Sequence, residues 1–160
     1  MADARFSDAR EAPLRLRAVD ADDLKVISAL LQDAVFPVGE MRFQRCKRRF
    51  VALVNRFRWE DRAAAERRGR GYERVQSLLT VDDVRGAATL GIDMAERDTV
   101  LSLLSVGFEP GEDGAGRITL VLAGDGAVAL DVECIEVALR DVTRPYLAPS
   151  RKAPHHPETE

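Results

Sequence analysis

Hydrophobic and polar residues follow two different periods in the first part of the chain. Residues 14–18 alternate between apolar side chains and arginine, which is typical of a half-buried strand. Between residues 24 and 34 the apolar residues recur every three or four positions, and Asp20 stands where a helix N-cap is expected. The pattern therefore predicts a strand followed by an amphipathic helix over residues 20–34. The apolar stripe of this helix consists of Leu24, Ile27, Leu31 and Ala34.

After Pro37 the apolar residues form runs that are typical of strands. Residues 50–54 are apolar at every position, which indicates a strand buried on both faces of a sheet. Residues 62–68 favour a helix by composition but have no apolar face, so we expect an exposed excursion with one fragile helical turn there. Further strands are expected over residues 72–81, 84–92, 101–108, 117–122 and 127–142, with a tight hairpin turn at Asp125-Gly126.

The period of two is broken at two places in the last third of the chain. The apolar parity changes between Leu103 and Leu104 and again between Cys134 and Ile135. A β-bulge inserts one extra residue into a strand, so that the apolar side chains on both sides of the change can point to the same face of the sheet. Each change of parity therefore predicts a β-bulge that curves its strand. The predicted fold is therefore α+β, mainly an antiparallel β-sheet of seven or so strands. We expect a curved sheet, sandwich or partial barrel with one N-terminal amphipathic helix.

Length and composition favour one cytoplasmic domain. The chain has 160 residues, and we expect a polar disordered tail over residues 1–12, a single β-rich domain over 13–146 and a Pro-rich disordered tail over 147–160. No apolar run approaches the length of a membrane span, and the first residues carry charges where a signal peptide needs apolar side chains. Only two cysteines are present, without metal-ligand spacing, which fits a reducing compartment.

Charge is strongly segregated along the chain. Residues 41–74 contain twelve Arg or Lys and four acidic residues, a local charge of +8 within a chain of net charge −3. A positive surface attracts an anionic partner without specifying its chemistry. We therefore predict a partner-binding surface in this region. Its candidate residues are Arg42, Arg45, Arg48, Arg56, Arg58, Trp59, Arg67, Arg68, Arg70 and Tyr72.

Two interpretations of this surface remain open. In the first, it binds an acidic protein surface, which could belong to a second copy of the same chain and so lead to self-association. In the second, it binds RNA or another nucleic acid, because Trp59, Tyr72 and several phenylalanines lie among the arginines as stacking residues do in single-strand binders. No membrane partner is expected.

Catalytic chemistry is not indicated by any motif. The only histidines are His155 and His156 in the Pro-rich segment, so the predicted domain lacks the commonest acid, base and metal ligand. We assign no catalytic, cofactor-binding or metal-binding residues and expect no cofactor. An enzyme using carboxylate and arginine chemistry is a further alternative, and it requires a deep pocket that gathers Arg49 or Arg56 with Asp82 or Asp131.

Four segments carry a resemblance to a known family. They are LKVISALLQDAVFPV from Leu24, RFVALVNRFRW from Arg49, LSLLSVGFEPG from Leu101 and LDVECIEVALRDVTRPY from Leu130. Together they resemble an uncharacterised alphaproteobacterial domain-of-unknown-function family, number 2948. The resemblance implies a bacterial protein, agrees with the cytoplasmic location expected from composition, and carries over no activity, cofactor or catalytic residue.

Overall fold

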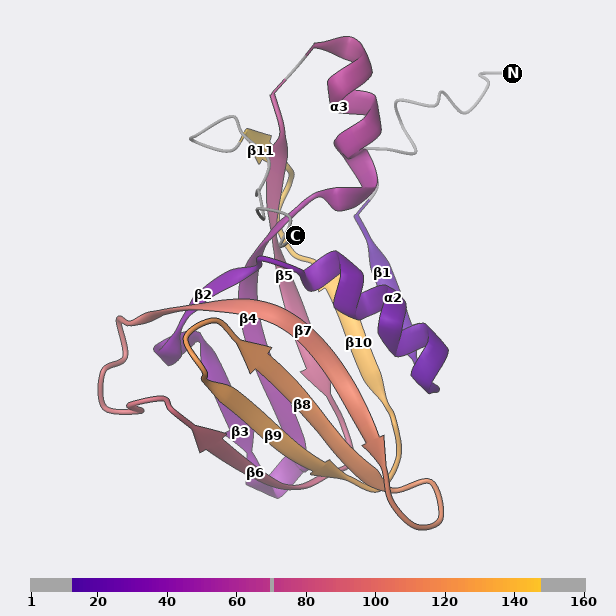
Figure 1. Cartoon of the computed structure of the whole chain (residues 1–160), viewed down its shortest axis with the longest axis vertical. Coiled ribbons are helices and arrows are strands. Elements are labelled where there is room, and N and C mark those ends of the chain that lie inside the picture. The colour runs from indigo at the N-terminus through magenta and orange to yellow at the C-terminus, as the bar shows by residue number, and fades with distance from the viewer. Residues whose placement is uncertain (1–12, 70, 148–160) are drawn as a thin grey trace, which may run out of the picture.

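The computed structural model describes residues 13–69 and 71–147. The predicted tail over residues 1–12, Arg70, and residues 148–160 of the predicted Pro-rich tail, with both histidines, lie outside the described residues. Leu147, the first residue of that predicted tail, instead belongs to a short strand. Within them the chain forms eleven strands, two α-helices and three short 3₁₀ turns (Figure 1). The helices are α2 (Ala21–Leu31) and α3 (Arg62–Arg68), and the 3₁₀ turns are η1 (Val38–Glu40), η2 (Arg45–Lys47) and η3 (Trp59–Asp61).

All of the strands join one open antiparallel sheet. Hydrogen-bonded neighbours follow the order β1-β10-β5-β4-β2-β7-β8-β9-β6, while β3 also pairs with β4 and β11 with β5. The strands are β1 (Arg15–Ala18), β2 (Val35–Pro37), β3 (Met41–Gln44), β4 (Arg49–Phe57), β5 (Glu73–Val81), β6 (Val84–Leu90), β7 (Val100–Pro110), β8 (Gly116–Leu122), β9 (Ala127–Val132), β10 (Val137–Asp141) and β11 (Tyr146–Leu147).

The sheet is strongly curved, so that its two halves face each other. In Figure 1 the half formed by β7, β8, β9 and β6 lies in front of the half formed by β4, β5 and β10, and the short strand β2 links them. One core fills the space between the halves, and it includes Ala52 and Leu79 from one half and Leu120 and Leu130 from the other. The predicted α+β class with a mainly antiparallel sheet is confirmed.

Helix α2 is the predicted N-terminal helix, and it is shorter than expected. The Asp20 side chain accepts a hydrogen bond from the Asp23 N–H at 2.8 Å, as its N-cap position requires. The helix ends at Leu31 because Asp33 takes a left-handed backbone conformation, and hydrogen bonds between this turn and Leu103 of β7 lead the chain into β2. Its apolar stripe is buried against β7, β1 and β4.

Only one of the two predicted bulges is present. The register of β7 against β8 shifts between Leu103 and Ser105, as expected. The second prediction was wrong, because β9 ends at Val132 and β10 begins at Val137, and these strands pair with different neighbours. The change of parity at Cys134 therefore marks the passage of the chain from one half of the sheet to the other. An unpredicted bulge lies in β6 between Val84 and Gly86.

The excursion after β4 is more ordered than predicted. Residues 62–68 form α3, and Ala64 and Ala65 are buried although the sequence shows no stripe of large apolar residues. Alanine has high helix propensity and allows close packing, which explains how a helix forms without such a stripe. The helix ends at Gly69, whose left-handed backbone is the usual glycine C-cap. The predicted excursion is exposed at five of these seven residues, and the correction is that it contains a seven-residue helix instead of a single fragile turn.

Gly116 at the start of β8 allows two chain segments to approach closely. A Cβ atom at this position would lie 2.6 Å from the Phe108 ring and still closer to the Glu109 carbonyl oxygen, whereas a Cβ atom at Gly107 would meet nothing. We expect Gly116→Ala to lower the free energy of unfolding by about 1–3 kcal/mol, the usual cost of overpacking. Chemical denaturation measures this change. Gly107→Ala is the matched control, and equal effects of the two substitutions would contradict the close approach.

Candidate functional site

The basic region of the sequence is divided by the fold into three parts. Arg42 and Arg45 belong to β3 and η2 at one end of the molecule, whereas Arg67 and Arg68 belong to α3 at the other end of its long axis (Figure 1). Arg56 and the residues around it lie between the two ends. The local charge of +8 therefore does not form one continuous surface.

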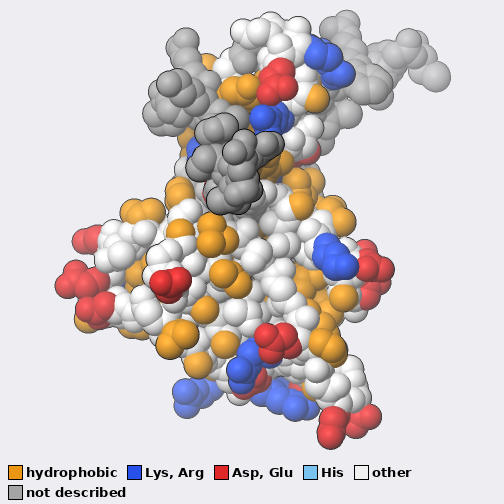
Figure 2. Space-filling model, in the orientation of Figure 1, with side chains coloured by type: hydrophobic (Ala, Val, Ile, Leu, Met, Phe, Trp, Pro, Cys, Tyr) orange, Lys and Arg blue, Asp and Glu red, His pale blue; other side chains and the backbone are white. Residues whose placement is uncertain are grey.

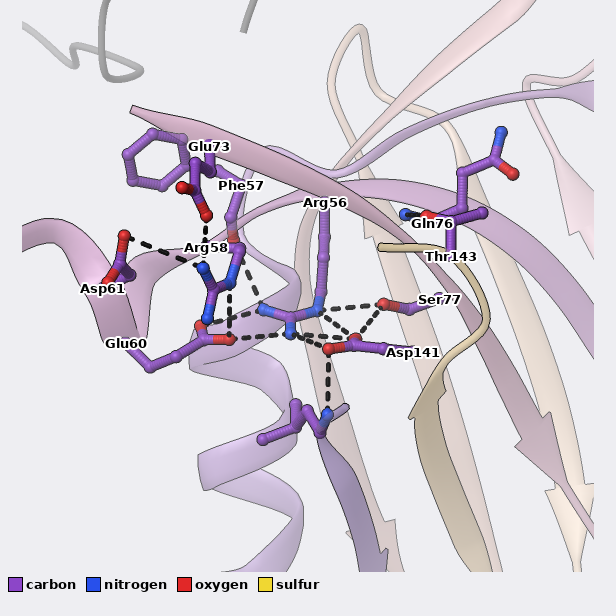
Figure 3. A network of polar contacts seen from close by, with 11 residues as sticks. Arg56, Phe57, Arg58, Glu60, Asp61, Glu73, Gln76, Ser77, Asp141 and Thr143 are labelled. Atoms are coloured by element: carbon purple, nitrogen blue, oxygen red, sulfur yellow. Dashed lines mark hydrogen bonds and ion pairs between the residues drawn. The ribbon is translucent and has the colours of Figure 1, made fainter. Parts of the chain in front are cut away.

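The middle part is a buried network centred on Arg56 (Figure 3). The Arg56 side chain is 0% exposed, and its guanidinium donates hydrogen bonds to Asp141 at 2.9 Å, to Glu60 at 2.8 Å and to Ser77 at 3.0 Å. Asp141 also accepts from the Ser77 hydroxyl at 2.7 Å and from the Leu14 N–H at 2.9 Å. These contacts join β4, β5 and β10 to the start of the chain's described part.

The surroundings of Arg56 keep it charged. Burial by itself lowers the pKa of the guanidinium. The hydrogen bonds that Arg56 donates to Glu60, together with the negative charges of Glu60 and Asp141, outweigh burial and raise that pKa above its ordinary value. Arg58 lies beside this network, where it is 7% exposed and pairs with Glu73 and more distantly with Asp61. Removal of one member of such a buried ion pair is strongly destabilising, because the remaining charge is left buried without its partner.

Arg56 and Arg58 are therefore removed from the predicted partner-binding surface. Arg56 belongs to β4, and Arg58 follows the end of that strand. Both side chains point into the interior, where they form ion pairs with acidic residues of η3, β5 and β10. Sequence alternation alone cannot distinguish a solvent-facing arginine from one that meets a buried carboxylate. The physical reason is that the partners are distant in sequence, with Asp141 lying 85 positions from Arg56.

The aromatic residues of the predicted surface pack against one another at the base of α3. The Phe57 and Trp59 ring centroids are 4.6 Å apart in an edge-to-face arrangement, and those of Phe57 and Tyr72 are 5.6 Å apart. The Trp59 Nε1–H donates to the Gln32 carbonyl oxygen at 2.9 Å, and the Tyr72 hydroxyl donates to Glu66 at 3.0 Å. Trp59 and Tyr72 are thus half-buried structural contacts, and each already has a polar partner.

The exposed cations at the other end form what we call the basic edge, which consists of Arg42, Arg45 and Lys47. All three are exposed on β3 and η2, and none has an ion-pair partner among the described residues. The neighbouring Arg48 differs because it pairs with Glu133 at 2.5 Å, and the hydrogen bond from Arg48 lowers the pKa of Glu133. Figure 2 shows Lys and Arg side chains, with acidic ones among them, at the lower end of the molecule.

A groove of about 200 Å³ lies beside the basic edge, and we call it the edge groove. It opens between β3 and β6, two strands at free margins of the sheet, and it is mostly apolar. Met94 contributes to it from the connection between β6 and β7. The complete lining is Met41, Arg42, Phe43, Phe50, Ala87, Thr89, Met94 and Val128.

A second depression, of about 510 Å³, does not match the geometry that the enzyme hypothesis requires. It contains Asp131, but the arginines that line it are Arg85 and Arg117, and Arg117 pairs with Asp131 at 3.0 Å. Arg49 instead pairs with Asp82 at 2.7 Å, and both side chains are partly exposed. Among residues 13–69 and 71–147, no group of three or more His, Cys, Asp or Glu side chains is placed to hold a metal ion.

Comparison with known families decides the family of the chain. A family model described as a protein of unknown function (DUF2948) matches residues 14–156. The chain belongs to this family. The resemblance of the four sequence segments is thereby confirmed, while an alphaproteobacterial origin remains a prediction. Comparisons of this DUF2948 protein with curated proteins and with solved structures found no match.

Sequence reasoning missed most of the edge groove. The apolar lining of the groove comes from segments as distant in sequence as Met41 and Val128. Lys47 of the basic edge lies in the basic region of the sequence but is not one of the candidate site residues. One feature of the sequence could have indicated the groove, since residues 86–90 form a strand-like run without any charge, which is unusual for an exposed edge strand.

None of the helices in the described part of the chain is long and apolar enough to cross a membrane.

Proposed function

We propose that this DUF2948 protein is a non-catalytic cytoplasmic binding module whose basic edge binds an acidic protein partner. The observation that carries the proposal is that Arg42, Arg45 and Lys47 are exposed and lack ion-pair partners among the described residues. Arg42 lines the edge groove, and Arg45 and Lys47 follow it in η2. Opposite charges steer partners together, and an adjacent apolar groove can add contact area at the centre of such an interface.

The same observations favour an acidic protein over a nucleic acid. Single-strand binders expose aromatic rings on which bases stack. In this protein Trp59 and Tyr72 are engaged with Phe57 at the base of α3, far from the basic edge (Figure 1). An RNA partner is therefore the competing outcome of the experiment below.

Fluorescence anisotropy with labelled polyglutamate and labelled single-stranded RNA tests the proposal at low and physiological salt. The edge variant is Arg42→Glu/Arg45→Glu, and the control Arg67→Glu/Arg68→Glu makes the same change of charge on α3. We expect polyglutamate to bind more tightly than RNA of equal charge. We also expect the edge variant to lose affinity by roughly tenfold or more, and the control by about threefold at most, because charge effects are screened over the length of the molecule.

Three outcomes would overturn the proposal. Tighter binding of RNA, lost in the edge variant, would make the basic edge a nucleic-acid surface. Equal losses in both variants would show that only net charge matters. Absence of polyglutamate binding at both salt concentrations would leave the basic edge as a solvated surface. Sedimentation of the protein alone separates self-association, which requires no added partner, from binding to another protein.

A further inference from the structure

Strand β6 is a free edge of the sheet that lacks the usual protection against pairing. It pairs with β9 on one side only, and it is the last strand in the order of the sheet. Exposed edge strands are commonly protected by charged side chains or proline. After Arg85, β6 contains only Gly86, Ala87, Ala88, Thr89 and Leu90, and Leu90 is 69% exposed. Such an uncharged edge is suited to pairing with an added strand.

The backbone groups of β6 can be assigned to the two sides of the strand. The Val84 N–H donates to the Arg48 carbonyl oxygen at 2.9 Å, so Val84 faces away from β9. Along a strand of an antiparallel pair, the backbone N–H and C=O groups of successive residues point alternately toward the partner strand and away from it. The bulge after Val84 inserts one residue and so shifts this alternation by one position. Ala87 and Thr89 are therefore the next residues whose N–H and C=O groups face the free side.

The free side of β6 faces the edge groove. Beyond the contact between Val84 and Arg48, no strand pairing joins β6 to β3 among the described residues. The side chains of Ala87 and Thr89 lie on the groove side, since their partners in β9, Leu130 and Val128, point into the core. An unpaired backbone edge, an apolar groove and the basic edge thus lie next to one another.

We propose that the partner contributes an extended acidic segment that adds to β6 as a further strand. This inference rests on the proposed function and specifies its partner. The segment forms backbone hydrogen bonds with Ala87 and Thr89, places its apolar side chains in the edge groove and directs acidic side chains toward Arg42, Arg45 and Lys47. In strand addition the backbone provides affinity and pockets for alternate side chains provide specificity. The unpaired cations select an acidic segment over a basic one.

The test uses a soluble peptide in which glutamate and valine alternate, with polyglutamate of equal charge as its comparison. We expect the alternating peptide to bind at least about tenfold more tightly, because it also fills the groove. In NMR spectra of the full chain, amide exchange at Ala87 and Thr89 should slow when the peptide is bound. Two further peptides carry N-methyl groups either on every valine or on every glutamate, and one of them should lose binding while the other keeps it.

Ala87→Glu and Ala88→Glu are the matched variants, because they make the same charge change on the groove side and on the outer side of β6. We expect Ala87→Glu to lower the affinity for the alternating peptide by roughly tenfold more than Ala88→Glu does. Similar binding of the two peptides, or equal losses from both N-methylated peptides, would overturn strand addition while leaving the proposed acidic partner intact. Failure of both the alternating peptide and polyglutamate to bind would overturn the proposed function as well.

Discussion

Replacement of Arg56 by methionine is expected to lower the free energy of unfolding by about 3–5 kcal/mol, the usual cost of leaving a buried charge without its partner. The guanidinium is 0% exposed and holds Asp141 and Glu60, which come from distant parts of the sequence. Methionine has a similar length but leaves Asp141, whose side chain is 5% exposed, with an uncompensated negative charge. Urea denaturation followed by circular dichroism measures the change.

Two controls separate the buried pair from the loss of an arginine in general. Arg67→Met removes an exposed arginine of α3 and should change the free energy of unfolding by less than about 0.5 kcal/mol. Arg56→Met/Asp141→Leu removes both charges and should recover a large part of the stability, since a buried ion pair can often be replaced by apolar residues. An Arg56→Met protein as stable as Arg67→Met would show that the network does not hold the strands together.

Phe57→Ala is expected to have an effect of similar size, about 3–5 kcal/mol, as is usual for truncation of a buried aromatic residue. Phe57 is 0% exposed and contacts the rings of Trp59 and Tyr72, which flank α3 on both sides in the sequence. Its loss should therefore also loosen α3. Trp59 is the single tryptophan of the chain, so a shift of its fluorescence reports this change directly.

Phe57→Leu provides the comparison for this prediction. Leucine keeps most of the buried volume and loses the edge-to-face contact with Trp59, so we expect a cost of about 1–1.5 kcal/mol. Trypsin cleavage within residues 62–68 should accelerate strongly in Phe57→Ala and only slightly in Phe57→Leu. Equal cleavage rates in Phe57→Ala and wild type would mean that α3 does not depend on the aromatic cluster.

Local pattern was sufficient to predict the class of the fold and several of its elements. The helical spacing that begins at Leu24, the cap at Asp20 and the bulge near Leu103 depend on residues close together in sequence, and each is found in the structure. The end of α2 was missed because it depends on hydrogen bonds to β7, about 70 positions away. The change of parity at Cys134 was misinterpreted because a bulge and a crossing between the halves of a sheet produce the same local pattern.

The candidate site was only partly predictable for the same reason. The sequence identified a basic region but could not distinguish Arg42, which has no ion-pair partner among the described residues, from Arg56, which meets Asp141. The edge groove depends on how β3 and β6 approach after the sheet has curved. The hydrophobic pattern predicts which side chains of each strand point into the core, but it does not predict how far apart two free edges of the sheet lie.

Arginine modification by phenylglyoxal, read by peptide mass spectrometry with and without polyglutamate, tests the central claim most directly. The claim is that the fold divides one basic region into an inner network that stabilises the sheet and an outer edge that binds. We expect Arg42 and Arg45 to react quickly and to be protected by polyglutamate, and Arg67 and Arg68 to react quickly with little protection. Arg56 and Arg58 should remain unmodified in the folded protein. Rapid modification of Arg56, or equal protection of Arg67 and Arg42, would contradict this division.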